Sequence, residues 1–127
     1  PKRFDAWFFV APAADEAVRV DGMEIREHRW MQAQDAIGAH RAGDIQLPPP
    51  TFVTLVRLSQ FRRVDEVLSA LRSATAETFT PRIRAIPGGA CSLYAGDAAY
   101  DGADLDSPGP RHRLWIMGTD WRYERTG

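Results

Sequence analysis

Residues 82–94, RIRAIPGGACSLY, set the β part of the fold. Arg82–Ile86 alternates charged and apolar side chains, which is the pattern of a strand with one buried face. A Pro-Gly-Gly triplet at 87–89 interrupts the alternation with the residues of a tight turn, and Ala90–Tyr94 follows as a second short run. The stretch therefore predicts a β-hairpin.

Three further segments extend this prediction towards the C-terminus. Gly96–Gly109 is rich in glycine and aspartate and is expected to form a loop. Its four aspartates lack the spacing of an EF-hand, so we expect them to be solvated. His112–Met117 again has the composition of a strand, which Thr119–Thr126 is expected to extend.

Three helices are expected upstream of the hairpin. Gln32–Ala42 contains helix-forming residues and stops before Gly43. Thr51 follows three prolines and is expected to cap the second helix. The third helix, over Val64–Leu71, has the clearest amphipathic spacing in the chain. The expected apolar positions are Phe52, Leu55, Val56 and Leu58 in the second helix and Val64, Val67, Leu68 and Leu71 in the third.

Two strands are expected before the first helix. Arg3–Val10, RFDAWFFV, is a short aromatic-rich run, which is typical of a buried strand. Met23–Met31 follows a turn at Asp21-Gly22, and neither of its sides is uniformly apolar, so it is expected to be half exposed or to line a site. Strands at both ends with helices between them indicate an α+β or α/β fold, in a single domain over residues 1–127.

The composition is that of a foldable globular chain. Its 127 residues are 44% hydrophobic with a formal net charge of -1, which favours collapse over disorder. The balanced charge gives no general attraction to nucleic acid or to a membrane surface. No apolar run approaches the ~20 residues of a membrane-spanning helix, and a single cysteine excludes an internal disulfide. We expect a cytoplasmic protein that binds neither nucleic acid nor membranes.

Several common catalytic signatures are missing from the sequence. It has no G-x-S-x-G, Walker or dinucleotide-binding loop, and its three histidines lack the spacing of a zinc site. Cys91 is best explained as a small buried hydrophobic residue. Fifteen of the sixteen basic residues are arginines, and the six between Arg57 and Arg84 outnumber the acidic residues of that segment. They predict either a phosphate contact or a solvated helix face.

Glu24 and Glu27 flank Arg26 in the second expected strand. Mg²⁺ is bound by one or two carboxylates together with substrate phosphates, so one of these glutamates could serve as a ligand. A strand places them on opposite sides, which excludes a paired site. Surface ion pairs with Arg26 or Arg29 are the alternative.

Three sequence elements, taken in order, resemble a known family. They are Arg3-Phe4-Asp5-x-x-Phe8-Phe9, Glu24-x-x-Glu27-x-x-Trp30 and, after a helix, Leu47-Pro48-Pro49-Pro50-Thr51-x-x-Thr54-Leu55. Together they resemble the C-terminal half of a Nudix hydrolase of the coenzyme A diphosphatase-like branch. Gly96-Asp97 and Tyr100 match a further Gly-Asp-x-x-Tyr element of that branch. The resemblance covers residues 3–60 well and 80–115 loosely.

The defining Nudix box, G-x5-E-x7-R-E-U-x-E-E-x-G-U, is not present. When Arg26-Glu27 is aligned with its Arg-Glu pair, Val18 and Trp30-Met31 stand where the box requires glutamates. The resemblance therefore implies that this chain is the C-terminal portion of a larger protein. It implies part of an α/β/α sandwich with a mixed sheet: strands and helices over 1–60, then a helix and a β extension with a C-terminal hairpin over 61–127.

The resemblance also implies a function. The implied activity is hydrolysis of a nucleoside diphosphate that is linked to another group, with coenzyme A or acyl-CoA as possible substrates. The implied cofactor is Mg²⁺, with Mn²⁺ as an alternative, and its ligands are expected mainly outside this chain. Glu27, and after it Glu24, are the expected catalytic carboxylates. Arg3, Phe4 and Trp7 are the expected substrate-binding residues.

Two alternatives remain open. The first is a non-catalytic, Nudix-derived module that binds a nucleotide or a protein in the same cleft. The second is an unrelated α+β scaffold with coincidental motif matches, which predicts that Arg3–Val10 and Met23–Met31 do not share a sheet. Because an unpaired apolar strand edge favours association, the expected partner is the N-terminal Nudix half or a second copy of the chain in a homodimer.

Overall fold

The computed structural model describes residues 5–14, 19, 21–23 and 28–127, which fall into two compact units. The sheet unit consists of Met31–Gln60 and Ala76–Gly127. The N-terminal unit consists of Pro1–Trp30 and Phe61–Thr75. The expected single domain over the whole chain stays a prediction.

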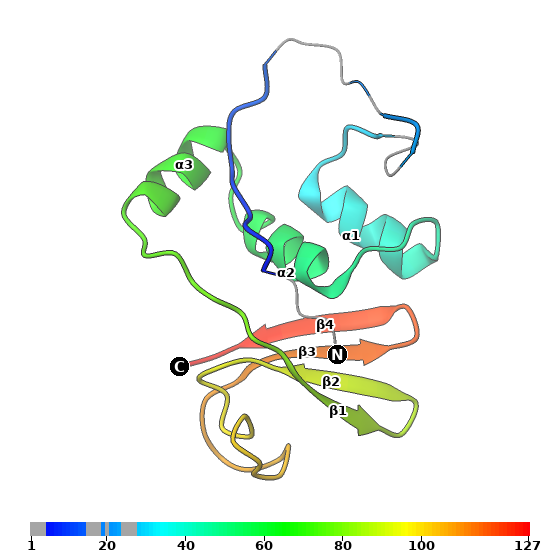
Figure 1. The fold of residues 1–127 in the computed structure, drawn as a ribbon, viewed down its shortest axis with the longest axis vertical. Coiled ribbons are helices and arrows are strands. Elements are labelled where there is room, and N and C mark those ends of the chain that lie inside the picture. Colours follow the sequence, from blue (N-terminus) through cyan, green and yellow to red (C-terminus); the bar gives the residue numbers. More distant parts are fainter. Residues whose placement is uncertain (1–4, 15–18, 20, 24–27) are drawn as a thin grey trace. The chain divides into compact units, whose positions relative to one another are not determined.

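The sheet unit contains a four-stranded antiparallel sheet with the strand order β1-β2-β3-β4 (Figure 1). Its strands are β1 (Arg82–Ile86), β2 (Gly89–Leu93), β3 (His112–Met117) and β4 (Asp120–Arg125). The hairpin over 82–94 and the C-terminal hairpin are confirmed. The predicted extension of β3 is wrong, because the chain reverses at Gly118-Thr119 and returns as a separate strand. Each described pairing is antiparallel, so the parallel pair of a mixed sheet is not among the described strands.

Two adjacent glycines shape the first hairpin. The pairing of Ile86 with Gly89 leaves Pro87 and Gly88 as a two-residue turn, and Gly88 has a φ of 81°, which favours glycine. Gly89 is required for a different reason, because a Cβ atom there would lie 2.0 Å from the carbonyl oxygen of Ile116 on β3. The glycine pair therefore fixes both the turn and the close approach of β2 to β3.

Two helices precede the sheet in this unit. α1 (Ala33–Ala42) ends at Gly43 as predicted, and the φ of 83° at Gly43 is the left-handed conformation of a helix cap. α2 (Pro49–Leu58) begins before Thr51, so the predicted Thr51 cap is wrong. Proline is tolerated in the first turn because the N–H that it lacks has no intrahelical partner there.

The two faces of the sheet are covered differently. On one face, α1 and α2 pack on the strands through a cluster of buried side chains: Ile37, Phe52, Val53, Tyr94 and Leu114. On the other face, Cys91 and Leu93 pack against Ala99 in the loop between β2 and β3. The expected burial of Cys91 is confirmed, and burial raises the pKa of its thiol. The unit is thus a helix pair, a sheet and a covering loop, which confirms the α+β class.

The N-terminal unit contains α3 (Val64–Arg72), where the sequence predicts the third helix. Val67 is buried, whereas Val64 and Leu71 are exposed. Taken over the described residues, no helix of the chain is both long enough and apolar enough to cross a membrane.

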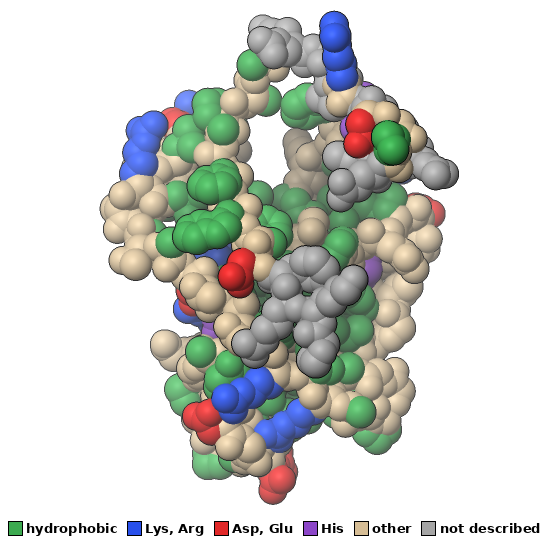
Figure 2. Space-filling model, in the orientation of Figure 1, with side chains coloured by type: hydrophobic (Ala, Val, Ile, Leu, Met, Phe, Trp, Pro, Cys, Tyr) green, Lys and Arg blue, Asp and Glu red, His purple; other side chains and the backbone are tan. Residues whose placement is uncertain are grey.

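The predicted buried strand over Arg3–Val10 is wrong for its described residues. Asp5–Val10 forms neither helix nor strand, and its side chains Trp7, Phe8 and Phe9 are exposed. Hydrophobic side chains are visible at the surface in Figure 2. The physical reason is that a strand needs a partner for its backbone hydrogen bonds, and no described residue pairs with this segment. Arg3 and Phe4 lie outside the described residues.

The predicted strand over Met23–Met31 is also wrong where the structure describes it. Met23 and residues 28–31 form no strand, and residues 24–27 lie outside the described part of the chain. Alternation without a uniformly apolar side gives such a segment little burial to offset the loss of backbone entropy. The described parts of the two N-terminal segments therefore do not share a sheet, which is the arrangement that a coincidental resemblance predicts.

Candidate functional site

Four of the five site residues expected from the sequence lie outside the described residues: Glu27, Glu24, Arg3 and Phe4. Their catalytic and substrate-binding roles stay predictions. Trp7 is described, and its side chain is 76% exposed. Its ring stacks with that of Phe9 at a centroid separation of 6.4 Å, so the two rings lie on the same side of the segment. The structure thus places Trp7 at the surface of the N-terminal unit.

A metal site requires several carboxylate, imidazole or thiolate groups close together. Within the described ranges, no group of three or more His, Cys, Asp and Glu side chains is arranged to hold a metal ion. The described residues therefore do not fit a Mg²⁺ site by themselves. That the ligands lie mainly outside this chain stays a prediction.

The loop between β2 and β3 contains a buried ion pair. The carboxylate of Asp97 accepts hydrogen bonds from Nη2 and Nε of Arg113 on β3, at 2.6 and 2.7 Å. The backbone N–H groups of His112 and Ala99 donate to the same carboxylate, at 2.7 and 2.8 Å. Both side chains of the pair are buried. The prediction of a solvated loop is therefore wrong for Asp97, because this side chain has four protein donors in place of water.

The hydrogen bonds keep this pair charged. Burial by itself raises the pKa of Asp97, but the hydrogen bonds from Arg113 and from the two backbone N–H groups lower it to about 2. The hydrogen bonds that Arg113 donates to Asp97 in turn raise the pKa of Arg113. Arg113 also donates to the carbonyl of Leu105, at 2.7 Å. The pair and the contact with Leu105 therefore tie the loop to β3 at two points, Asp97 and Leu105, and have a structural role.

Tyr100 provides a second anchor for the same loop. Its hydroxyl donates to the carbonyl of Thr80 at 3.0 Å, and the guanidinium of Arg82 lies 4.1 Å from the centre of its ring. Gly96 has a φ of 92°, which a side chain would strain. The Gly96-Asp97-x-x-Tyr100 element is therefore a folding element of the sheet unit.

Three of the six arginines between Arg57 and Arg84 have structural partners within their own unit. Arg82 pairs with Asp101 at 3.0 Å, and Arg84 donates to two loop carbonyls. Arg63 pairs with a neighbouring aspartate in the N-terminal unit. Arg63, next to α3, is 72% exposed, which agrees with the expected solvated helix face, whereas Arg82 and Arg84 lie on β1 and contact the loop between β2 and β3. Arg57 has a different environment.

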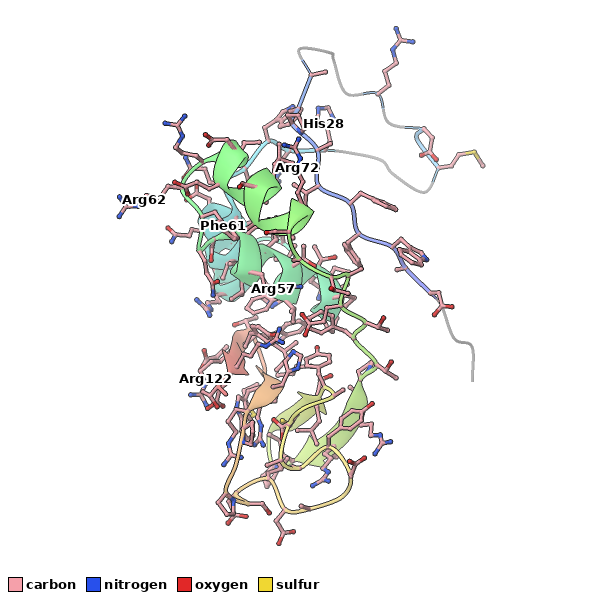
Figure 3. All side chains as sticks on the ribbon, turned by 90° about the vertical axis from the view of Figure 1, so that its left-hand side faces the viewer. His28, Arg57, Phe61, Arg62, Arg72 and Arg122 are labelled. Carbon is pink, nitrogen blue, oxygen red and sulfur yellow. The ribbon has the colours of Figure 1, made fainter. Side chains whose placement is uncertain are left out.

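Arg57, Glu77 and Arg125 form what we call the arginine–glutamate cluster of the sheet unit. Glu77 accepts hydrogen bonds from Nη2 and Nη1 of Arg125 on β4, at 2.6 and 3.0 Å. Arg57 extends from α2 (Figure 3) and its Nη2 lies 3.5 Å from the Glu77 carboxylate. Its guanidinium also lies 5.4 Å from the ring centre of Phe79. The hydrogen bond from Arg125 is the main reason that the pKa of Glu77 is lowered.

A group of aromatic rings adjoins this cluster. Its members are Phe79, Tyr94, His112 and Tyr123, with neighbouring ring centroids 5.1–6.4 Å apart. His112 lies directly opposite Arg125 in the β3–β4 pairing, and Tyr123 lies two residues before Arg125 on the same side of β4. The Nε2 atom of His112 and the hydroxyl of Tyr123 are buried without a hydrogen-bond partner in the described part of the chain.

The sequence gives little sign of this arrangement. Only the alternation of Tyr123 and Arg125 could have indicated that these two side chains share one side of a strand. Arg57, Glu77 and His112 come from a helix, an irregular segment and another strand, and periodicity within a segment does not report contacts between segments. This cluster is the candidate site that tertiary structure adds.

His40 is a second buried imidazole in the sheet unit. Its Nδ1 atom accepts a hydrogen bond from the backbone N–H of Leu47 at 3.1 Å, which requires the neutral ring with the proton on Nε2. The ring packs against Phe52 and Trp121, with centroids 5.3 and 4.4 Å away. Burial, and secondarily the charge of Arg41, lowers the pKa of His40 below 6.5.

The free energy of unfolding is therefore expected to fall as the pH drops below 6.5, because the unfolded chain then binds a proton that the folded chain excludes. One proton gives a slope of at most about 1.4 kcal/mol per pH unit. Urea unfolding between pH 7.5 and 5 measures the slope, which His40→Gln should reduce. His28→Gln, at an exposed position, is the control, and an equal slope in the wild type and in His40→Gln would contradict the assignment.

Comparison with known proteins links the chain to one family of hydrolases. Over 103 residues it is 28% identical to acyl-coenzyme A diphosphatase NUDT19 of Xenopus laevis, a match that covers 78% of this chain and 27% of that protein. Over 66 residues it is 33% identical to putative nudix hydrolase 7 of Caenorhabditis elegans, which covers 51% of this chain and 22% of that protein. The chain thus spans about a quarter of the length of these curated relatives.

No family model and no solved structure matches the chain. The two curated matches support a general relationship between this chain and the Nudix hydrolases.

Proposed function

We propose that this chain is the substrate-binding portion of a Nudix-type hydrolase, which cleaves a nucleoside diphosphate linked to another moiety such as coenzyme A or acyl-CoA. The observation that carries the proposal is the 28% identity over 103 residues with an acyl-coenzyme A diphosphatase. The order of the three N-terminal motifs along the chain supports the same assignment.

In this proposal, the acidic residues that hold Mg²⁺ or Mn²⁺ lie mainly outside the chain, because this sequence lacks the Nudix box. The bound cation would neutralise the diphosphate and favour attack by water. Glu27, and secondarily Glu24, would contribute a supplementary carboxylate. Arg3 would contact phosphate, and Phe4 or Trp7 would contact a base through its ring. The exposure of Trp7 supports a contact beyond the described residues.

We expect the full-length protein to hydrolyse acyl-CoA, coenzyme A or a nucleotide sugar with Mg²⁺ or Mn²⁺, and the 127-residue chain alone to hydrolyse none of them. In the full-length protein, Glu27→Gln should lower kcat about 100-fold or more, since a positioned carboxylate contributes about 10²–10⁴ to the rate. Asp44→Asn removes an exposed carboxylate of the sheet unit and should leave kcat unchanged. Chromatographic detection of the products measures both effects.

Two results of this assay have different meanings. If the full-length protein cleaves none of the three substrate classes with either cation, the hydrolase proposal fails. If Glu27→Gln retains the wild-type kcat while the substrates are cleaved, the assignment of Glu27 fails and the hydrolase proposal stands.

The second candidate is a non-catalytic Nudix-derived module that binds a nucleotide or a protein. The lack of a metal-binding group among the described residues agrees with this candidate and with the hydrolase alike. The coding sequence upstream of Pro1 distinguishes the two candidates. A glutamate-rich Nudix box within about 100 residues, the scale of one domain, supports the enzyme, whereas saturable nucleotide binding without turnover and without such a box supports the module.

A further inference from the structure

The arginine–glutamate cluster has an excess of positive charge at an accessible position. Two guanidinium groups share one carboxylate, and no other acidic side chain of the described residues forms an ion pair with either arginine. The side chains of Arg57, Glu77 and Arg125 are 42%, 31% and 47% exposed. An anion from solution can therefore reach both arginines.

The geometry around Glu77 is one that a phosphate group also satisfies. Arg125 uses Nη1 and Nη2 to bind the two carboxylate oxygens, and this fork matches phosphate oxygens equally well. Arg57 adds a second guanidinium on one of these oxygens, at 3.5 Å. The carboxylate of Glu77 thus occupies the position that an anionic ligand would take.

A second observation concerns the polar atoms next to Arg125. The hydroxyl of Tyr123 is buried and donates to no acceptor in the described part of the chain, and Nε2 of His112 is buried there without a hydrogen-bond partner. The Nδ1 atom of His112 donates to the carbonyl of Ala95 at 2.9 Å. Phosphate oxygens accept hydrogen bonds, so a bound phosphate can accept one from the hydroxyl of Tyr123.

We propose that Arg57 and Arg125 bind a phosphate group of the nucleotide substrate, and that Glu77 occupies this site when no ligand is bound. Tyr123 contributes a hydroxyl donor to the bound phosphate. This inference rests on the proposed function for the identity of the ligand as a nucleotide, and it assigns a phosphate-binding role to residues that the sequence motifs do not include.

The proposal is tested by titrating the 127-residue chain with AMP, inorganic phosphate and adenosine, with binding followed by ¹⁵N-detected shifts of the arginine Nε–H groups. AMP is expected to shift the signals of Arg57 and Arg125 saturably, and adenosine is expected not to. Glu77→Gln should tighten AMP binding about fivefold, because it removes a competing ion pair of modest strength. Arg125→Gln should weaken binding at least about tenfold.

Two matched variants separate ligand binding from a structural role. Arg122 lies on the same strand and is exposed (Figure 3), so Arg122→Gln should leave the AMP affinity unchanged. Tyr123→Phe removes a hydroxyl without a partner among the described residues, so it should weaken AMP binding about threefold, within the range of one lost hydrogen bond, while the free energy of unfolding changes little.

Several outcomes would overturn the proposal. The first is the lack of a saturable shift with AMP in both the wild type and Glu77→Gln. The second is an equal loss of AMP affinity in Arg122→Gln and Arg125→Gln. The third is binding of inorganic phosphate without binding of AMP. Because the titration measures binding by this chain without turnover, its failure is distinguishable from a failure of the full-length protein to hydrolyse its substrates.

Discussion

Asp97→Asn is expected to lower the free energy of unfolding of the sheet unit by about 3–5 kcal/mol, the range for removing one partner of a buried ion pair. The substitution keeps the size of the side chain but leaves the guanidinium of Arg113, which is 1% exposed, without a counter-charge. It also replaces an acceptor of four hydrogen bonds with a group that has one acceptor oxygen. Small domains have a total free energy of unfolding of about 5–15 kcal/mol. A loss of this size should therefore leave part of the Asp97→Asn protein unfolded.

Asp101→Asn is the matched control for this prediction. Asp101 belongs to the same loop and pairs with Arg82 at 3.0 Å, but its side chain is 90% exposed. An exposed pair of this kind contributes about 0–1 kcal/mol. Urea unfolding measures both variants, and amide hydrogen exchange at Ala99 and His112 reports the loop directly. Equal losses of stability in the two variants would show that burial of the pair has no energetic importance.

The wild type should show the same contribution as a pH dependence. The pKa of Asp97 is lowered from 3.8 to about 2 in the folded protein. A lowered pKa of an acid stabilises the fold at pH values above 3.8, and this stabilisation is lost as the pH falls from about 4 to about 2. Asp97→Asn should flatten the dependence of unfolding free energy on pH in this window, whereas Asp101→Asn should retain it.

Phe52→Ala is expected to destabilise the sheet unit by about 3–5 kcal/mol, the usual cost of removing a buried aromatic ring and leaving a cavity. Phe52 on α2 is fully buried and belongs to the cluster that joins both helices to β3. Its ring lies 5.3 Å from that of His40 on α1 and 5.4 Å from that of Trp121 on β4. The Phe52 ring thus contributes both to the contact between α1 and α2 and to the contact between α2 and the sheet.

Phe8→Ala makes the same chemical change at a side chain that is 53% exposed. It should alter the free energy of unfolding by no more than about 0.5 kcal/mol, as is usual for surface substitutions. Thermal or urea unfolding compares the two variants. If Phe52→Ala costs as little as Phe8→Ala, then α1 and α2 are not held on the sheet by this cluster.

Local sequence signals were sufficient for several elements of this protein. Each of the helices is found at the position indicated by helix formers, by Gly43 or by amphipathic spacing. The first hairpin is also found where Pro87, Gly88 and Gly89 predict it. These signals act within a few residues, through proline and glycine conformations and the burial of one side of a segment, so they can be recognised without knowledge of the rest of the chain.

The same local signals gave wrong predictions for the described parts of the N-terminal segments. Asp5–Val10 has the composition of a buried strand, but a strand is stable only when another strand satisfies its backbone hydrogen bonds. Composition describes the segment itself and not its partner. The expected site residues Glu24 and Glu27 lie outside the described residues, so the placement of the predicted catalytic site stays a prediction.

The sequence by itself predicted an α+β or α/β fold, the positions of the helices and of the first hairpin, and the family that the chain resembles. Only the tertiary structure showed that Asp97 is buried against Arg113 and that Arg57 and Arg125 converge on Glu77. The physical reason is that the energy of a charge depends on its solvation and on its neighbours in space. Both quantities arise when distant segments pack together, and neither leaves a periodic pattern in the sequence.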